Sequence, residues 1–77
     1  DAVMTMQERI KLVTLGQQLS TLGVEVRMAQ IGLKNVVENY GMHSRQTVEA
    51  LHLYQELATQ FEHLEQEFLA LKEKYSK

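Results

Sequence analysis

The residues best suited to metal chemistry are a glutamate and a histidine three positions apart, Glu49 and His52. In di-iron helical bundles, a Glu-x-x-His pair supplies two ligands that point into the bundle core. Here the apolar seam of the surrounding helix is expected to run through Thr47, Ala50 and Tyr54, which turns Glu49 and His52 outward. We therefore interpret the pair as part of a solvated face.

Two further pairs, His52 with Glu56 and His63 with Glu67, have the i, i+4 spacing that brings side chains together on a helix. Either pair could contact a zinc ion, but two ligands do not complete a zinc site. We interpret both pairs as weak surface contacts and predict no metal site.

Other groups that carry chemistry are missing from the sequence. The 77 residues include no cysteine, which excludes a disulfide framework, a thiolate metal site and a thiol nucleophile. No serine lies in a nucleophile elbow, and no glycine-rich loop could hold a phosphate. We therefore predict no catalytic residue and no cofactor, and the sequence favours a protein that is not an enzyme.

Charge and hydropathy exclude further classes. The chain is 44% hydrophobic with a formal net charge of −2, which does not fit intrinsic disorder. Its basic cluster, Lys72, Lys74 and Lys77, is interleaved with Glu73 and is typical of a helix C-terminus rather than a nucleic-acid site. The longest stretch without a charge, 12–24, is too short and too polar to span a membrane. We expect a cytoplasmic protein that binds neither nucleic acid nor membrane.

The elements that must position these residues are helices, because the apolar periodicity is helical throughout. Each half of the chain carries a heptad seam, in which apolar residues alternate at spacings of three and four. The first seam comprises Leu12, Leu15, Leu19, Leu22, Val26, Ala29, Leu33, Val36 and Tyr40. The second comprises Thr47, Ala50, Tyr54, Leu57, Phe61, Leu64, Phe68, Leu71 and Tyr75.

Residues 39–44 interrupt this pattern. Gly41 suits the left-handed position that ends a helix, with Met42 placed to touch Val37, and Ser44 is a good N-cap for the next helix, accepting from the amide of Gln46 or Thr47. The sequence thus predicts an all-α, antiparallel hairpin of two helices, about 3–40 and 45–75, as a single domain over 1–77.

A long parallel coiled coil is the alternative architecture. Tyr40 and Thr47 are seven residues apart, so the heptad register continues through the break. A single helix would then be about 110 Å long. The combined stop and start signals at Gly41 and Ser44 favour the hairpin, in which Tyr40 is expected to close one end of the core. Gly16 and Gly23, seven apart, either allow close approach of the helices or are merely tolerated.

The first helix carries a second apolar stripe, which begins at Val3 and Met6. A helix that is apolar on two faces is normally buried on two faces, and one partner helix cannot cover both. An isolated hairpin of this size is also marginally stable. We therefore expect a homodimer that forms a four-helix bundle, with the first helix central. The residues predicted to bind the partner are Ile10, Val13, Val24, Met28 and Ile31.

The turn segment 40–48, which reads Tyr-Gly-Met-His-Ser-Arg-Gln-Thr-Val, resembles that of the small sporulation-regulating aspartyl-phosphate phosphatases of Gram-positive bacteria. The resemblance covers residues 27–60 and implies a two-helix hairpin whose partner is a response regulator. That family's Ser-Gln-Glu-Leu-Asp motif aligns with residues 51–55 or, shifted by three, with 54–58, where Gln55, Glu56 and Leu57 match. The acidic residue expected to act on the phosphoryl group is missing in both alignments, so the catalytic motif is not retained.

Taken together, these patterns predict a non-enzymatic protein-interaction or oligomerisation module, such as a small regulatory adaptor or inhibitor. Its expected partners are a second copy of the chain and another protein. A phosphatase-like regulator of response regulators is the alternative function.

Overall fold

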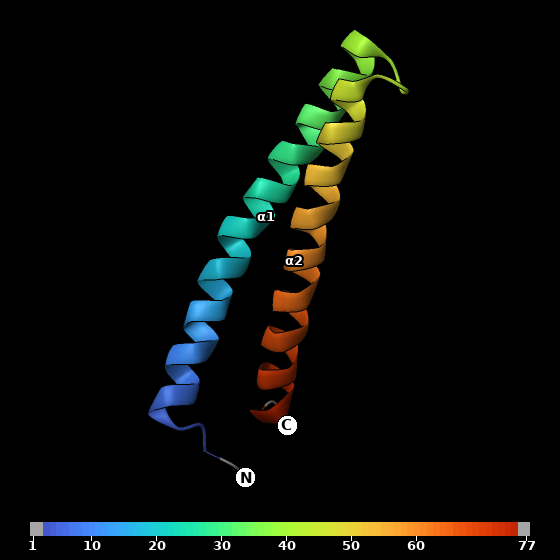
Figure 1. Ribbon diagram of the computed structural model, residues 1–77. Helices are drawn as coiled ribbons and strands as arrows, with labels where there is room; N and C mark the ends of the chain where they lie inside the picture. The colour runs from blue at the N-terminus through green and yellow to red at the C-terminus, as the bar shows by residue number, and fades with distance from the viewer. Residues whose placement is uncertain (1–2, 76–77) are drawn as a thin grey trace.

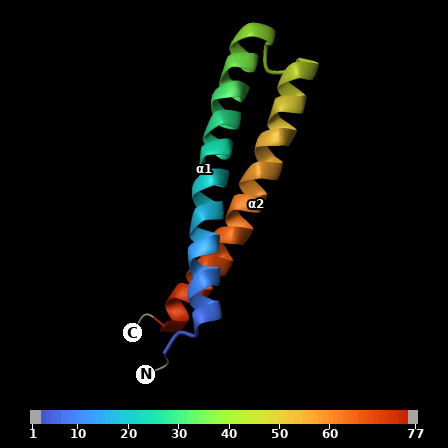
Figure 2. The ribbon, with the colours of Figure 1, turned by 90° about the vertical axis from the view of Figure 1, so that its left-hand side faces the viewer.

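The computed structural model describes residues 3–75, which form two α-helices joined by a short turn. Helix α1 spans Met6–Tyr40 and helix α2 spans Arg45–Tyr75. The two helices run antiparallel and side by side, and the start of α1 and the end of α2 lie at the end opposite the turn (Figures 1 and 2). The molecule measures 55 × 16 × 15 Å, which agrees with a pair of helices of this length and not with a single rod of twice that length.

The hairpin prediction is therefore confirmed, and the continuous coiled coil is wrong. The predicted bounds of the second helix are correct, whereas the first helix begins three residues later than predicted. Thr5 accounts for this start, because its hydroxyl accepts from the Glu8 amide while the Glu8 carboxylate accepts from the Thr5 amide. This reciprocal capping box satisfies two amides that the helix itself leaves without partners.

The turn depends on the carbonyl of Gly41. The hydroxyl of Thr47 donates to this carbonyl at 2.6 Å, and the hydroxyl of Ser44 lies 3.1 Å from it. Ser44 also accepts from the Thr47 amide at 3.1 Å, so the predicted N-cap is confirmed. These bonds explain why Thr47, a polar residue, is buried.

The predicted contact of Met42 with Val37 is wrong, although Gly41 does have a positive φ of 87°. Its ψ of 163° is extended rather than left-handed helical. With this ψ the carbonyl of Gly41 points to the start of α2, where it accepts from Thr47. The Gly41 amide closes α1 by donating to Val37 at 2.9 Å, and Met42 is exposed instead of covering Val37. Tyr40 is also exposed, so it does not close the end of the core as predicted.

The apolar seam between the helices contains few fully buried side chains. Within residues 3–75, Leu15 and Leu22 are the two buried apolar side chains, and most other seam residues are half-buried. Rings from α2 occupy the space beside two glycines of α1: Phe61 would lie 3.4 Å from a Cβ on Gly23, and Phe68 would lie 3.5 Å from a Cβ on Gly16. The glycines thus let the aromatic rings approach α1, which is the first of the two predicted readings.

A candidate interaction surface on α1

The five residues predicted to bind a partner all lie on α1 with exposed side chains. Their exposed fractions range from 50% to 63%, although all are large and apolar: Ile10, Val13, Val24, Met28 and Ile31. Met6 extends the same stripe towards the N-terminus and is also exposed. Val3, which was predicted to begin the stripe, is exposed but precedes α1. We call the six exposed residues of α1 the α1 stripe.

The stripe lies on the side of α1 that faces away from α2. At 100° per residue, Ile10 and Val24 are about half a turn from Leu15 and Leu22, which are buried against α2. In the middle of α1 the stripe is interrupted by Gln17 and Ser20, both exposed. The surface therefore consists of an N-terminal apolar block, a polar centre and a C-terminal apolar block.

An apolar groove between α1 and α2 adjoins the C-terminal block. It has a volume of about 490 Å³, and Glu25 is the one ionisable residue among its lining residues. From α1 it is lined by Val24, Glu25, Met28, Ala29, Gly32, Leu33 and Val36, and from α2 by Ala50, Leu53 and Leu57. Because Val24 and Met28 belong to both features, the groove and the stripe form one continuous apolar surface.

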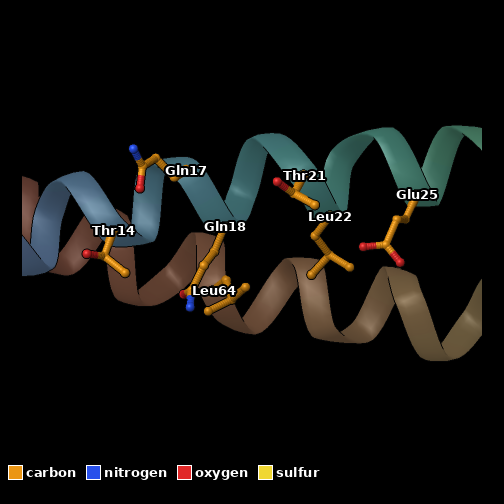
Figure 3. Close-up of a pocket in the computed structure, with 7 residues that line it drawn as sticks. All are labelled: Thr14, Gln17, Gln18, Thr21, Leu22, Glu25 and Leu64. Atoms are coloured by element: carbon orange, nitrogen blue, oxygen red, sulfur yellow. The ribbon is translucent and has the colours of Figure 1, made fainter.

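The adjoining groove is polar. It has a volume of about 460 Å³, shares Glu25 with the apolar groove, and is lined mainly by threonine and glutamine from α1 (Figure 3). Figure 3 shows Glu25 at the end of this groove that is nearer the turn, with Leu64 contributed by α2. The surface therefore changes from polar to apolar at Glu25. On α1, one row of residues spaced three and four apart lines both grooves: Thr14, Gln18, Thr21, Glu25, Met28 and Gly32.

The histidine and glutamate pairs of α2 that the sequence suggested for metal binding face solvent, including His63 and Glu67. Glu49 and His52 are exposed, and Glu49 pairs with Arg45 at 3.2 Å instead of with a histidine. His52 shares a shallow depression of about 520 Å³ with Gln55, Glu56, Thr59 and Gln60. Over residues 3–75 the structure contains no group of three histidine, aspartate or glutamate side chains that could hold a metal ion.

A polar cluster at the open end of the hairpin was missed by the sequence analysis. The hydroxyl of Tyr75 donates to the carboxylate of Glu8, and the ammonium of Lys74 lies 3.4 Å from the same carboxylate. The bond from Tyr75, assisted by the Thr5 amide, lowers the pKa of Glu8 from 4.5 to about 2. Acceptance by the charged carboxylate also raises the pKa of Tyr75, because it favours the protonated phenol.

No stretch of either helix in the described part of the chain is both long and apolar enough to cross a membrane. The chain matches no protein-family model, no curated protein and no solved structure. The resemblance of the turn to the aspartyl-phosphate phosphatases therefore stays a prediction that rests on the residues of that segment.

Proposed function

We propose that this protein is a non-enzymatic interaction module that assembles through the α1 stripe. The observation that carries the proposal is the exposure of Ile10, Val13, Val24, Met28 and Ile31 on the face of α1 opposite α2. Large exposed apolar patches such as these two blocks mark sites of association on protein surfaces. The first partner we assign is a second copy of the chain, giving a four-helix assembly in which the two α1 helices lie between the two α2 helices.

The surface area of the hairpin supports association. A compact protein of this mass exposes about 4,800 Å², whereas the hairpin exposes 6182 Å². The excess is about 1,400 Å², and a standard interface covers about 800 Å² on each partner. A second hairpin could therefore cover the α1 stripe and still leave part of the molecule free for another protein, as a small adaptor or inhibitor requires.

The proposal is tested by placing a charge in each apolar block. Ile10→Asp and Met28→Asp should convert the dimer to a monomer in sedimentation experiments, because a carboxylate in an apolar interface loses hydration without gaining a partner. Gln30→Asp is the matched control, since Gln30 is an exposed residue of α1 outside the stripe. Circular dichroism reports whether each variant keeps its helices.

If an aspartate variant unfolds, Val13→Thr supplies a milder test, because it keeps the shape of the side chain and replaces one methyl group with a hydroxyl. It should weaken dimerisation while the helical content stays the same. An unchanged, folded dimer for all three stripe variants would remove the proposed interface.

A phosphatase-like regulator of response regulators is the second candidate. It is favoured by the grouping of His52, Gln55 and Glu56 in one depression on α2, since Gln55 and Glu56 are matched in the phosphatase resemblance. The test is to mix the protein with phosphorylated response regulators and to follow the loss of label. Faster loss with the wild type than with Glu56→Gln would support this function, and a rate equal to spontaneous hydrolysis would exclude it for the regulators tested.

A further inference from the structure

Gly32 is a glycine in the interior of α1 whose lack of a side chain the hairpin itself does not use. A Cβ built on Gly32 would meet no atom within 4 Å, whereas one on Gly16 or Gly23 would meet the ring of Phe68 or Phe61. Glycine in a helix interior is unfavourable relative to alanine. Because Gly32 lines the apolar groove, its missing side chain leaves room for a group from outside the hairpin.

The apolar groove has the length and the composition of a site for a helix. Its α1 wall extends from Val24 to Val36, which corresponds to about 18 Å of helix. Three turns of a second helix would cover about 16 Å of this length. The residues that line the groove are apolar or glycine except for Glu25. Such a groove accepts the apolar face of an amphipathic helix, whose side chains at i, i+3, i+4 and i+7 point the same way.

Both walls of the groove carry large apolar side chains that are open to solvent. Leu53 on α2 is 53% exposed, and Met28 on α1 is 62% exposed. A helix that lies between these side chains would remove both from water, which favours its binding.

The charges beside the groove are acidic. Glu25 is the one ionisable residue of the lining. On α2, Glu49 and Glu56 lie four residues before and three residues after Leu53, so the three side chains share one face of the helix, and both glutamates are exposed. Glu49 pairs with Arg45, whereas neither Glu25 nor Glu56 forms an ion pair in the part of the chain that the structure describes.

Basic side chains lie away from the groove. At 100° per residue, Arg27 and Lys34 are about 140–180° around α1 from Glu25 and Gly32. The two lysines within α2 lie in its last turn, at the end of the hairpin opposite the turn. The groove is therefore complementary to a partner that is apolar and positively charged.

We propose that the apolar groove binds a basic amphipathic helix of another protein, with an apolar side chain over Gly32 and a lysine or arginine beside Glu25. This inference rests on the proposed function, since it specifies the second partner of the interaction module. Gly32 and Glu25 are seven residues apart, which is two turns or about 11 Å of helix. The partner helix therefore carries its cation seven positions from an apolar side chain on the same face.

A second copy of the chain does not offer this pattern. Within residues 3–75, no lysine or arginine is seven positions from an exposed large apolar residue. Arg27 and Lys34, for example, are seven positions from each other, and the other neighbours at this spacing are Ser20 and Gly41. The pattern that fits the groove must therefore come from a different protein.

A displayed library of helical peptides tests this inference on the intact chain. Each peptide carries leucine at i, i+3 and i+4, and its other positions vary among lysine, glutamate, glutamine and alanine. Peptides are selected that bind the wild type and not Gly32→Leu, which fills the groove. The selected peptides should contain lysine at least fivefold more often than glutamate at a position seven residues from one of the leucines. Selection of no peptide, or of peptides without this preference, overturns the inference.

Charge reversal tests the contact with Glu25, using one selected peptide. Glu25→Lys should weaken its binding at least fivefold, and replacing the selected lysine of the peptide with glutamate should restore the affinity. Gln30→Lys is the matched control, because it adds a positive charge at an exposed position of α1 about 140° around the helix from Glu25. Equal weakening by the two lysine variants would contradict a contact between Glu25 and the peptide.

The shape of the groove is tested at Gly32. Gly32→Ala and Gly32→Leu should both keep the helical circular dichroism spectrum, since nothing in the hairpin obstructs a Cβ at this position. Gly32→Leu should weaken peptide binding at least tenfold, whereas Gln30→Leu, which adds the same side chain outside the groove, should bind as the wild type does. Equal binding by the two leucine variants overturns the inference.

The outcomes separate this inference from the homodimer of the proposed function, because neither Gly32 nor Glu25 belongs to the α1 stripe. A sedimenting dimer that selects no basic peptide overturns the groove and leaves the dimer standing. A monomeric chain that selects basic peptides overturns the dimer and supports the groove. Displacement of the peptide from the wild type by an excess of Gly32→Leu would mean that a second copy fills the groove, which overturns the inference.

Discussion

The phenolic hydroxyl of Tyr75 donates a hydrogen bond to the carboxylate of Glu8 and so joins the last turn of α2 to the first turn of α1. The same carboxylate accepts from the amide of Thr5 and therefore also caps α1. The Glu8 side chain thus caps the start of α1 and also joins the two helices at the open end of the hairpin.

Tyr75→Phe removes the donor and keeps the ring. We expect the pKa of Glu8 to rise from about 2 towards its ordinary value of 4.5, because the hydrogen bond from Tyr75 is the largest cause of the lowered value. Carboxyl chemical shifts followed by NMR titration measure this change. Tyr54→Phe is a matched control at a distant position of α2, and an unchanged pKa of Glu8 in Tyr75→Phe would contradict the assigned bond.

The stability of the hairpin should depend on pH through Glu8. Its pKa is lower in the folded state than in the unfolded state, so the unfolded chain binds more protons between about pH 4.5 and 2. The stabilisation from Glu8 is therefore complete above pH 4.5 and is lost as the pH falls towards 2.

Glu8→Gln isolates this contribution from those of the other carboxylates. The melting temperatures of the wild type and of Glu8→Gln should differ above pH 4.5 and should converge towards pH 2. A difference that stays constant over the whole range would show that ionisation of Glu8 does not stabilise the fold.

The first helix begins at Met6 because of a signal that the sequence contains, since Thr-x-x-Glu at residues 5–8 is a capping box. Gly41 and Ser44 were sufficient to predict the turn and the start of α2. The ψ of Gly41 could not be read from the sequence, because it depends on the hydroxyl of Thr47 six residues away.

The α1 stripe could be predicted because it depends only on the spacing of apolar residues within one helix. The apolar groove could not be predicted, since its second wall consists of Ala50, Leu53 and Leu57 from α2, and their position depends on how the two helices pack. The contact of Tyr75 with Glu8 was missed for the same reason, because 67 residues separate the two in the chain.

Thr47→Val should destabilise the hairpin by about 1 kcal/mol. The buried hydroxyl of Thr47 donates to the Gly41 carbonyl at 2.6 Å and lies 2.9 Å from the Ser44 hydroxyl, and valine keeps the shape without these bonds. Urea denaturation measures the loss. Thr47→Ser keeps the hydroxyl and should recover most of it, whereas equal losses for valine and serine would point to packing instead of hydrogen bonding.

Leu22→Ala should lower the free energy of unfolding by about 2–3 kcal/mol, because Leu22 is one of two buried apolar side chains in the described part of the chain. Leu69→Ala makes the same chemical change at an exposed position and should cost less than half as much. Thermal unfolding followed by circular dichroism compares the two variants. Similar losses would mean that the described seam is not the core of the protein.

The melting temperature of the wild type should rise with protein concentration, because association of folded chains stabilises them by mass action. Met28→Asp should melt at the same temperature over about a hundredfold range of concentration. A wild-type melting temperature that is independent of concentration would argue against the dimer without affecting the hairpin.

The carbonyl of Gly41, which accepts from Thr47 and lies beside the Ser44 hydroxyl, also leads to an expectation about the order of folding events. The loop closed at the turn is very short, so its entropic cost is small, and each further turn of helix pairs without closing another loop. We therefore expect the helices to pair first at residues 41–47 and then progressively towards Glu8 and Tyr75. Changes at Thr47 should slow folding, whereas Tyr75→Phe should chiefly speed unfolding.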